Sequence, residues 1–467
     1  NNAEITPSGP PDFMFVENKL GRVTFPDPLT VVFEWDDPNP DFLHLLAQAS
    51  PPFIYRPAHY LKQFHADFAD PEKLADEVDD ARVKSWAALH NKRDNMYKFD
   101  NPQQPTLQPW LNTSDSDGSR QLFVKNPYYH RIDSRGIQLP YIDVVNMDVV
   151  GGGLIAAKAN AGEVDLQARG LDFPDISILK KGEVDGGKYK VFLWANGAAS
   201  QIAIYPNLNF ADPVWRDVMR DVRFRRALSL GIDRRMINRA LYFGLAKEGG
   251  MTALSQSTLY DEADLHAWAA LDIDAANALL DEMGLTERMP SGLRKLPDGR
   301  PMEFVVETAG ERSEEENALA IITDTWRDLG GWDNGIPGPA TSPKYLAPTN
   351  QEFFAWPMWG QYYQTMGQSG EAPDLQPAQE LMDLAESWTR TDDTQERTAI
   401  WDRMLEIHAD QQFAIGILSE APQPIVVSNR LKNVPENGVW AYDPGAHFGI
   451  HRIDEFYLED PLVQVSR

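Results

Sequence analysis

The residues from Asp221 to Gly244, DVRFRRALSLGIDRRMINRALYFG, constrain the fold more than any other stretch of this chain. Asp221 precedes an apolar run, where a side-chain oxygen satisfies the first free N–H groups of a helix. Apolar residues then recur at i, i+3, i+4 and i+8, namely Phe224, Ala227, Leu228 and Ile232. Asp233 restarts the pattern, Gly244 ends it, and the second run is Met236, Ile237, Ala240 and Leu241. The stretch therefore predicts a helix, a capped break and a second helix.

The bulk composition bounds the class of protein. With 467 residues, 42% of them hydrophobic and 24% charged, the chain is long enough for two or three hydrophobic cores. Its formal net charge of -27 repels nucleic acid and anionic lipid, so neither is expected as a partner. The absence of cysteine excludes disulfides and thiolate chemistry. The chain contains no run of about 18 apolar residues, so no membrane span is predicted.

Periodicity and turn residues predict the order of the other elements. Residues 189–209 are expected to form two strands around the turn Asn196-Gly197, and Gly151 to Gly153 to open a helix that runs to residue 160. A hairpin is expected over 23–35 and a long surface loop over 99–120. Further helices are expected over 42–47, 71–92, 274–283, 314–329, 377–388 and 394–409. Further strands are expected over 144–150, 302–308, 352–359, 413–418 and 425–428.

Patterns typical of cofactors or catalysis are weak. The run from Gly151 to Ala156 fits G-x-G-x-x-A, but no second parallel strand ending in an acid follows, so a structural glycine turn is favoured over a dinucleotide site. His447 and His451 lie four apart, but no ligand-spaced cluster predicts a metal. We therefore expect no cofactor, no metal and no catalytic residue. A glycosidase needs only two carboxylates, and 70 Asp and Glu leave that alternative open.

Aromatic residues are concentrated in the stretch FFAWPMWGQYYQ, residues 353–364. A strand over 352–359 would point Trp356 and Trp359 in opposite directions. We expect Trp359, beside Gly360 at the strand end, to reach a ligand, because amphipathic rings with amide neighbours suit a polar, flat solute. The expected ligand-binding residues are Trp359, Trp356, Gln361, Tyr362, Tyr363, Asn196 and Gln201. The alternative is that these rings only fill a core.

Several motifs together resemble one family. DVRFRRALSLGIDRRMI is similar to the signature helix of the bacterial extracellular solute-binding proteins of family 5. These proteins are receptors of oligopeptide-, dipeptide-, nickel- and oligosaccharide-type ABC importers. Three further segments resemble the family in the same order, namely PAHY at residues 57–60, NPYY followed by LPYID at 126–143, and AGEVDL at 161–166. The resemblance covers residues 23 to 450.

The resemblance implies an α/β, two-lobed periplasmic-binding-protein-like fold with mixed sheets. It places the first lobe at residues 1–143, the second lobe at 144–415 and a return to the first lobe at 416–467. The lobes are expected to be joined by two crossover segments, Lys125–Val150 and Phe413–Val427. In the family a further stretch begins the first lobe, so the N-terminal part of that lobe is expected to be missing from this sequence.

The resemblance also implies a function. It predicts a monomeric, non-enzymatic receptor, periplasmic or attached to the cell surface, that traps one peptide or oligosaccharide by hinge closure and delivers it to an ABC transporter permease. Peptide receptors of the family usually pair an Asp with the ammonium of the ligand. No Asp or Glu lies between Glu352 and Glu371, so an oligosaccharide or uncharged peptide-like solute is expected. A secreted carbohydrate-active enzyme is the alternative.

Overall fold

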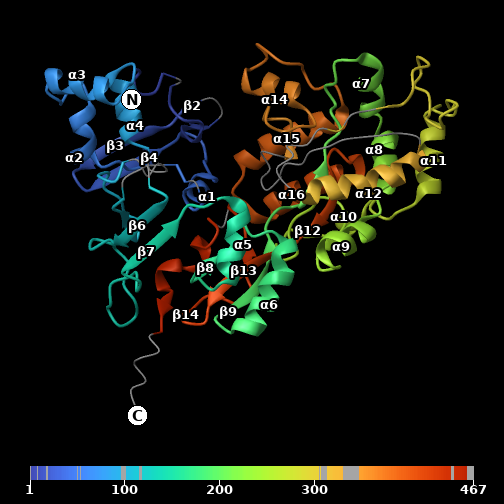
Figure 1. Cartoon of the computed structure of the whole chain (residues 1–467). Coiled ribbons are helices and arrows are strands. Elements are labelled where there is room, and N and C mark those ends of the chain that lie inside the picture. The colour runs from blue at the N-terminus through green and yellow to red at the C-terminus, as the bar shows by residue number, and fades with distance from the viewer. Residues whose placement is uncertain are drawn as a thin grey trace.

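Two lobes rise from a central body in the computed structural model (Figure 1). We call them the N-terminal lobe (residues 2–148), the central body (149–196 and 420–459) and the helical lobe (197–419). The structure describes residues 2–7, 9–16, 19–49, 51–52, 54–95, 101–114, 118–303, 306, 313–329, 346–442 and 446–459. The predicted strand over 302–308 lies largely outside these residues. The predicted two-lobed α/β fold is confirmed.

The N-terminal lobe combines a hairpin, a cluster of short helices and a three-stranded sheet. Its strands are β1 (Phe15–Val16), β2 (Lys19–Leu20), β3 (Arg22–Asp27), β4 (Thr30–Glu34), β5 (Trp110–Asn112), β6 (Arg120–Lys125) and β7 (Val144–Asp148). Its α-helices are α1 (Phe42–Leu46), α2 (Ala58–Leu61), α3 (Pro71–Asp80) and α4 (Trp86–Arg93). The pairing of β3 with β4 confirms the predicted hairpin.

Two predictions for this lobe are corrected. The single helix expected over 71–92 is two helices, because Arg82 adopts a φ of 53° and Ser85 starts α4 by accepting a hydrogen bond from the N–H of Ala88 at 3.2 Å. The surface loop expected over 99–120 contains β5, which pairs with β6, which in turn pairs with β7. The predicted loop therefore supplies one strand of a three-stranded sheet, whereas β7 lies within the strand predicted over 144–150.

The central body is built on a mixed four-stranded sheet of order β15-β9-β13-β8. Its strands are β8 (Leu166–Gln167), β9 (Tyr189–Asn196), β13 (Pro422–Ser428) and β15 (Val439–Trp440). β13 runs antiparallel to β8 and β9, whereas β15 runs parallel to β9. The helices α5 (Gly152–Asn160) and α6 (Ile176–Gly186) and the pair of strands β14 (Leu431–Lys432) and β16 (Tyr457–Leu458) complete it. β7 and β8, which flank the Gly151–Gly153 turn and α5, lie in different sheets, so they do not form the parallel βαβ unit that a dinucleotide site needs.

The helical lobe is built around a three-stranded sheet of order β10-β12-β11. Its strands are β10 (Ile202–Ile204), β11 (Lys247–Glu248) and β12 (Ile415–Ser419). Its helices are α7 (Pro213–Arg220), α8 (Val222–Leu230), α9 (Arg234–Tyr242), α10 (Glu262–His266), α11 (Ile273–Glu282), α12 (Ser313–Leu329), α14 (Pro357–Gln364), α15 (Gln376–Arg390) and α16 (Thr394–Gln411). Among the described residues, no helix is both long enough and apolar enough to cross a membrane.

The predicted helix pair is confirmed as α8 and α9. The carboxylates of Asp221 and Asp233 accept hydrogen bonds from the first turns, from Arg223 N at 2.9 Å and Met236 N at 2.8 Å. Phe224, Ala227 and Ile237 are fully buried in the largest core cluster. The expected buried face is wrong at Met236, which is 53% exposed, and at Ala240, which is also exposed. Arg234 is instead buried, so α9 turns a guanidinium, and not a thioether, towards the interior.

The links between body and helical lobe differ from the prediction. β9 leads to β10 through residues 197–201, and β12 leads to β13 through residues 420–421. β9 pairs with β13 in the body, while β10 pairs with β12 in the helical lobe. The segment that lies beside the expected crossover 413–427 is therefore 197–201. The family resemblance had instead predicted 125–150 as its neighbour. The pairing of β9 with β13 places residues 422–428 beside 189–196. The family resemblance had instead predicted that this segment belongs to the first lobe, with residues 1–143.

Candidate functional site

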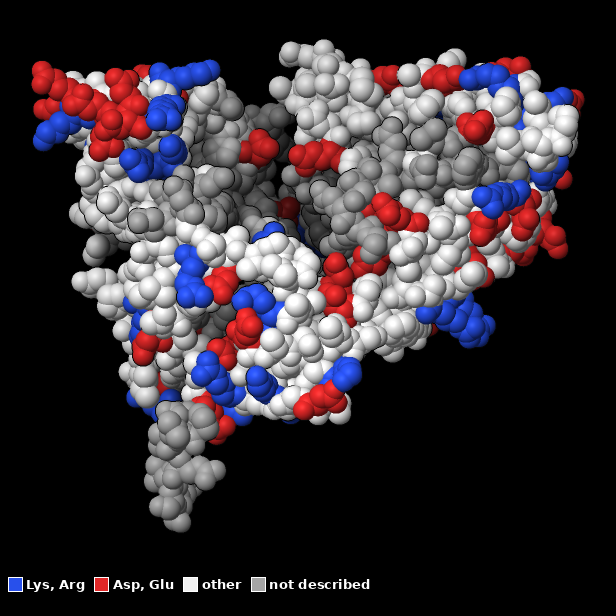
Figure 2. Space-filling model, viewed as in Figure 1, with Lys and Arg blue, Asp and Glu red and all other residues white. Residues whose placement is uncertain are grey.

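A deep cleft separates the N-terminal lobe from the helical lobe (Figure 2). An ion pair between the described residues joins the two lobes: Asp41, at the start of α1, contacts Arg397 on α16, with 2.7 Å between Oδ1 and Nη2. The Asp41 carboxylate does not cap its own helix, although it stands at the N-cap position. It is therefore available to the opposite lobe.

The Arg397 side chain is held in place by contacts within its own lobe, in addition to its pairing with Asp41. Its guanidinium lies 4.5 Å from the centroid of the Trp388 ring, and its Nε donates to the carbonyl of Thr391 at 2.8 Å. Its side chain is only 13% exposed. A cation held by a ring and a carbonyl loses little conformational freedom on pairing, so this contact favours the state in which the lobes lie together.

Replacing Asp41 with Asn is expected to favour separation of the lobes by about 1–2 kcal/mol, because solvent partly screens a carboxylate that is 33% exposed. Since the chain has no cysteine, Glu72→Cys on α3 and Glu282→Cys on α11 allow specific labelling for distance measurements by electron spin resonance. Asp37→Asn is the matched control, because Asp37 pairs with Lys19 within the N-terminal lobe at 2.7 Å. Identical distance distributions for the two variants would contradict the prediction.

The predicted aromatic site is largely a core. Residues 352–356 form no strand, and the helix α14 begins at Pro357, so the predicted strand over 352–359 is wrong. Trp356 and Trp359 are 0% exposed. Their rings stack at a centroid distance of 6.2 Å, and Phe353 stacks on Trp356 at 4.8 Å. In this conformation both indoles are buried in the core, and a binding role for either stays a prediction.

The other predicted ligand residues on α14 are more accessible. Gln361 and Tyr362 are half-buried, and Tyr363 is 47% exposed. Burial, with a smaller effect of the Glu386 carboxylate, raises the pKa of the Tyr363 hydroxyl, which stays neutral and able to donate at physiological pH. α14 stands at the side of the helical lobe that borders the cleft (Figure 1). The binding role of these three residues stays a prediction.

Asn196 and Gln201 lie at the links and not on α14. The backbone N–H of Asn196 donates to Ala421 O at 2.9 Å, and that of Gln201 donates to Leu418 O at 2.5 Å. The Asn196 side chain accepts from Ala198 N at 3.0 Å. Their backbones thus tie the two links together, while a contact of either side chain with a solute stays a prediction.

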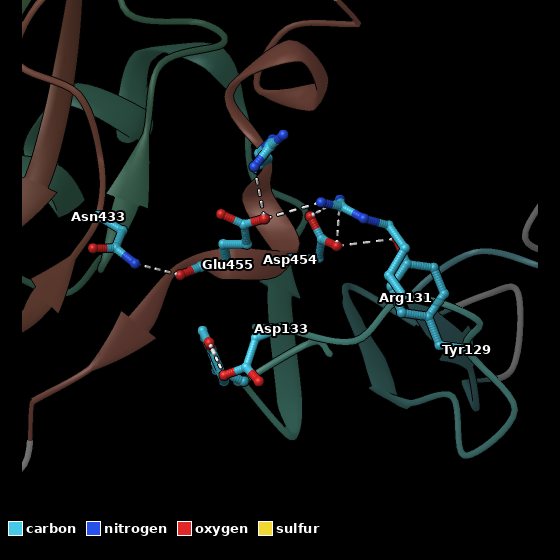
Figure 3. A network of polar contacts seen from close by, with 8 residues as sticks. Tyr129, Arg131, Asp133, Asn433, Asp454 and Glu455 are labelled. Carbon is cyan, nitrogen blue, oxygen red and sulfur yellow. Dashed lines mark hydrogen bonds and ion pairs between the residues drawn. The ribbon is translucent and has the colours of Figure 1, made fainter. Parts of the chain in front are cut away.

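A polar network joins the N-terminal lobe to the central body (Figure 3). Asp454, 3% exposed, accepts from Arg131 Nη1 at 2.7 and 2.6 Å and from the Tyr129 hydroxyl at 3.1 Å. Arg131 Nη2 also donates to Glu455 at 2.9 Å. Nearby, four hydrogen bonds, from Ile137 N, the Tyr141 hydroxyl, and the side chain and backbone N–H of Arg135, keep the pKa of Asp133 well below its usual range. The network holds the segment between β6 and β7 against the C-terminal part of the body.

A cavity of about 500 Å³ lies at the same junction. It is lined by most of the loop from Asn101 to Asn112, excluding Gln103 and Leu107, and by Phe123 of β6, Val145 of β7 and Ile453 beside Asp454. Sequence patterns could not predict this cavity, because Ile453 lies more than 300 residues from the other lining residues. The same holds for Asp41 and Arg397, whose residue types alone carry no information about pairing.

The histidines and carboxylates of the described residues do not gather into a metal-binding cluster. No group of three or more His, Asp or Glu among these residues is placed to hold a metal ion. His447 stacks on Trp440 at 4.4 Å, and His451 packs against Trp194 at 4.3 Å and bonds to Val439 O at 3.2 Å. The two histidines therefore pack in the body.

Comparison with known proteins agrees with this architecture. The family model described as bacterial extracellular solute-binding proteins, family 5 Middle, matches residues 3–336. The periplasmic alpha-galactoside-binding protein of Rhizobium meliloti (strain 1021) is 21% identical over 428 residues, which cover 84% of this chain and 58% of that protein. The chain thus spans less than two thirds of the length of this curated relative.

Solved structures show the same fold. An oligopeptide-binding protein OppA superposes with a TM-score of 0.71 and 28% identity, covering 98% of this chain and 78% of that one. The periplasmic binding protein MelB of Agrobacterium fabrum, in complex with stachyose, superposes with a TM-score of 0.63 and 18% identity, covering 94% and 67% of the two chains. The chain therefore belongs to the bacterial extracellular solute-binding proteins of family 5.

Proposed function

We propose that the protein is the solute receptor of an ABC importer, which captures one peptide- or oligosaccharide-sized solute between its lobes and delivers it to a membrane permease. The observation that carries the proposal is the cleft between two lobes that meet through the Asp41–Arg397 pair. A solute that contacts both walls adds binding energy only when the lobes are together, so it shifts the population towards that state. A periplasmic or cell-surface location and a monomeric state complete the proposal.

An oligosaccharide or an uncharged peptide-like solute fits the cleft better than a peptide with a free amine. Glu371, the first carboxylate after α14, lies 3.6 Å from Arg216 and 3.9 Å from Arg220, so two cations already neutralise it. The accessible polar side chains of α14 are the amides of Gln361 and Gln364 and the hydroxyls of Tyr362 and Tyr363. Amides and phenols bind hydroxyl groups without requiring a charge. The names of two relatives, which mention an alpha-galactoside and stachyose, agree with this class.

We expect binding without turnover. The protein purified without denaturation should retain, or take up from a mixture of α-galactosides and short peptides, one tightly bound solute per chain. Native mass spectrometry measures the added mass, and mass spectrometry of the supernatant detects any product. Continued release of shortened sugars or peptides would overturn the receptor function and favour the carbohydrate-active enzyme. Failure to retain any member of a broad solute library would count against capture itself.

A further inference from the structure

The cavity at the junction of the N-terminal lobe and the body has the β5-β6-β7 sheet as its floor. Asn112 of β5, Phe123 of β6 and Val145 of β7 are direct cross-strand partners, so they lie in one row across the sheet. All three line the cavity, as does Trp110, two residues before Asn112 on the same face of β5. The Trp110 indole is held by a hydrogen bond from Nε1 to Ile142 O at 2.9 Å.

The loop that forms the wall is fixed from behind at both ends. Asn101, 8% exposed, accepts from the Tyr60 hydroxyl at 2.7 Å and donates to Arg93 O at 2.6 Å. Asn126, 2% exposed, donates to the carbonyls of Thr106 and Gln108 at 3.1 and 2.9 Å. Two buried asparagines thus fix the conformation of the loop 101–112 in the absence of a ligand. Because the loop is already ordered, less conformational entropy is lost on binding.

The lining indicates the chemistry of a ligand. It contains the carboxamides of four residues, a threonine hydroxyl and two aromatic rings, and no charged side chain; the amide residues are Asn101, Gln104, Gln108 and Asn112. An amino acid or phosphate would bring a charge that nothing in the lining balances. A sugar ring presents hydroxyls at its edge and C–H groups on its face, which match amides and aromatic rings. The volume of about 500 Å³ is within the range of small-molecule sites.

One donor in this wall lacks an acceptor. Gln104 Nε2 is shielded from solvent and has no hydrogen-bond partner among the described residues, while its Oε1 accepts from Asn101 Nδ2 at 3.4 Å. A shielded amide N–H without a partner is unfavourable, and a small side-chain rotation towards the cavity would let a ligand oxygen satisfy it.

We propose that the junction cavity is a second ligand site, separate from the cleft, that binds a neutral mono- or disaccharide. Trp110 and Phe123 provide the apolar contact, and Gln104 donates to a sugar hydroxyl. Ile453 belongs to the body, so a bound sugar touches the two parts that the Asp454 network joins. The sugar therefore stiffens this junction and does not close the cleft.

The test is hydrogen exchange of the full chain titrated with melibiose, a neutral disaccharide. Melibiose should protect the peptide covering residues 101–126, and Gln104→Met should weaken that protection about tenfold in apparent Kd, the scale of one lost hydrogen bond. Gln103→Met is the matched control, because Gln103 is exposed and does not line the cavity; it should behave as the unaltered protein.

The outcomes separate the two sites. Unprotected residues 101–126 at saturating melibiose, or equal protection in the Gln104 and Gln103 variants, would overturn the second site. Val145→Phe, which fills the floor, gives an independent check and should also abolish the protection. Failure of the cleft proposal is recognised separately, since a cleft ligand should protect residues 357–364 on α14 and the contact between α1 and α16 in all of these variants.

Discussion

Replacing Arg234 with Met is expected to lower the free energy of unfolding by about 3–5 kcal/mol. Arg234 is 3% exposed and sits at the start of α9. Its guanidinium donates to Gly416 O at 3.1 and 2.8 Å, to Ser229 O and Ala269 O at 2.9 Å, and to the Ser229 hydroxyl at 2.8 Å. The side chain thus joins α8, α9 and β12, and methionine would remove five hydrogen bonds from buried backbone and hydroxyl acceptors.

The neighbouring arginine gives a matched control. Arg235 is exposed on the same helix, so Arg235→Met should change stability by less than about 0.5 kcal/mol. Urea unfolding followed by circular dichroism measures both variants. If the Arg234 variant proves as stable as the Arg235 variant, the buried guanidinium does not organise the helical lobe.

Replacing Asp454 with Ala is expected to cost about 3 kcal/mol, the lower end for breaking a buried ion pair, because its partner Arg131 is 33% exposed. The variant removes the acceptor of both Arg131 and the Tyr129 hydroxyl. The attachment of the N-terminal lobe should loosen more than either lobe itself. Amide exchange of residues 126–143 should therefore accelerate before global unfolding is reached.

Glu455→Ala provides the comparison within the same network. Glu455 is 32% exposed and pairs with Arg131 at 2.9 Å and Arg452 at 3.2 Å, so its loss should cost less than about 1 kcal/mol. Equal destabilisation by the two alanine variants would show that the burial of Asp454 is not what holds the junction.

Local patterns in the sequence predicted local structure well. Asp221 and Asp233 cap α8 and α9 as expected, since a cap depends on residues two or three positions away. The strand predicted over 352–359 failed because an apolar, aromatic run fits a strand and a buried helix equally well. Pro357 was the available signal, since proline is favoured in the first turn of a helix, and α14 begins with it.

Long-range features could not be predicted in the same way. The pairing of Asp41 with Arg397 and the approach of Ile453 to Trp110 depend on how whole lobes meet, and residue type and spacing contain no information about that. Arg234 shows the same limit for a single side chain. Periodicity assigns an arginine to the surface, whereas the carbonyls that bury this one come from β12 and from residue 269.

The two links between the body and the helical lobe also limit how the molecule can move. Residues 420–421 span the whole distance from β12 to β13, and at about 3.6 Å per residue a connection this short has no slack for sliding or separation. The two links, residues 197–201 and 420–421, lie side by side, and the line through them is an axis of rotation. Rotation of the helical lobe about this axis bends both links without stretching either. The opening of the helical lobe then has a single angular coordinate. One interlobe distance therefore reports this rotation as long as the Asp454 network keeps the N-terminal lobe fixed on the body.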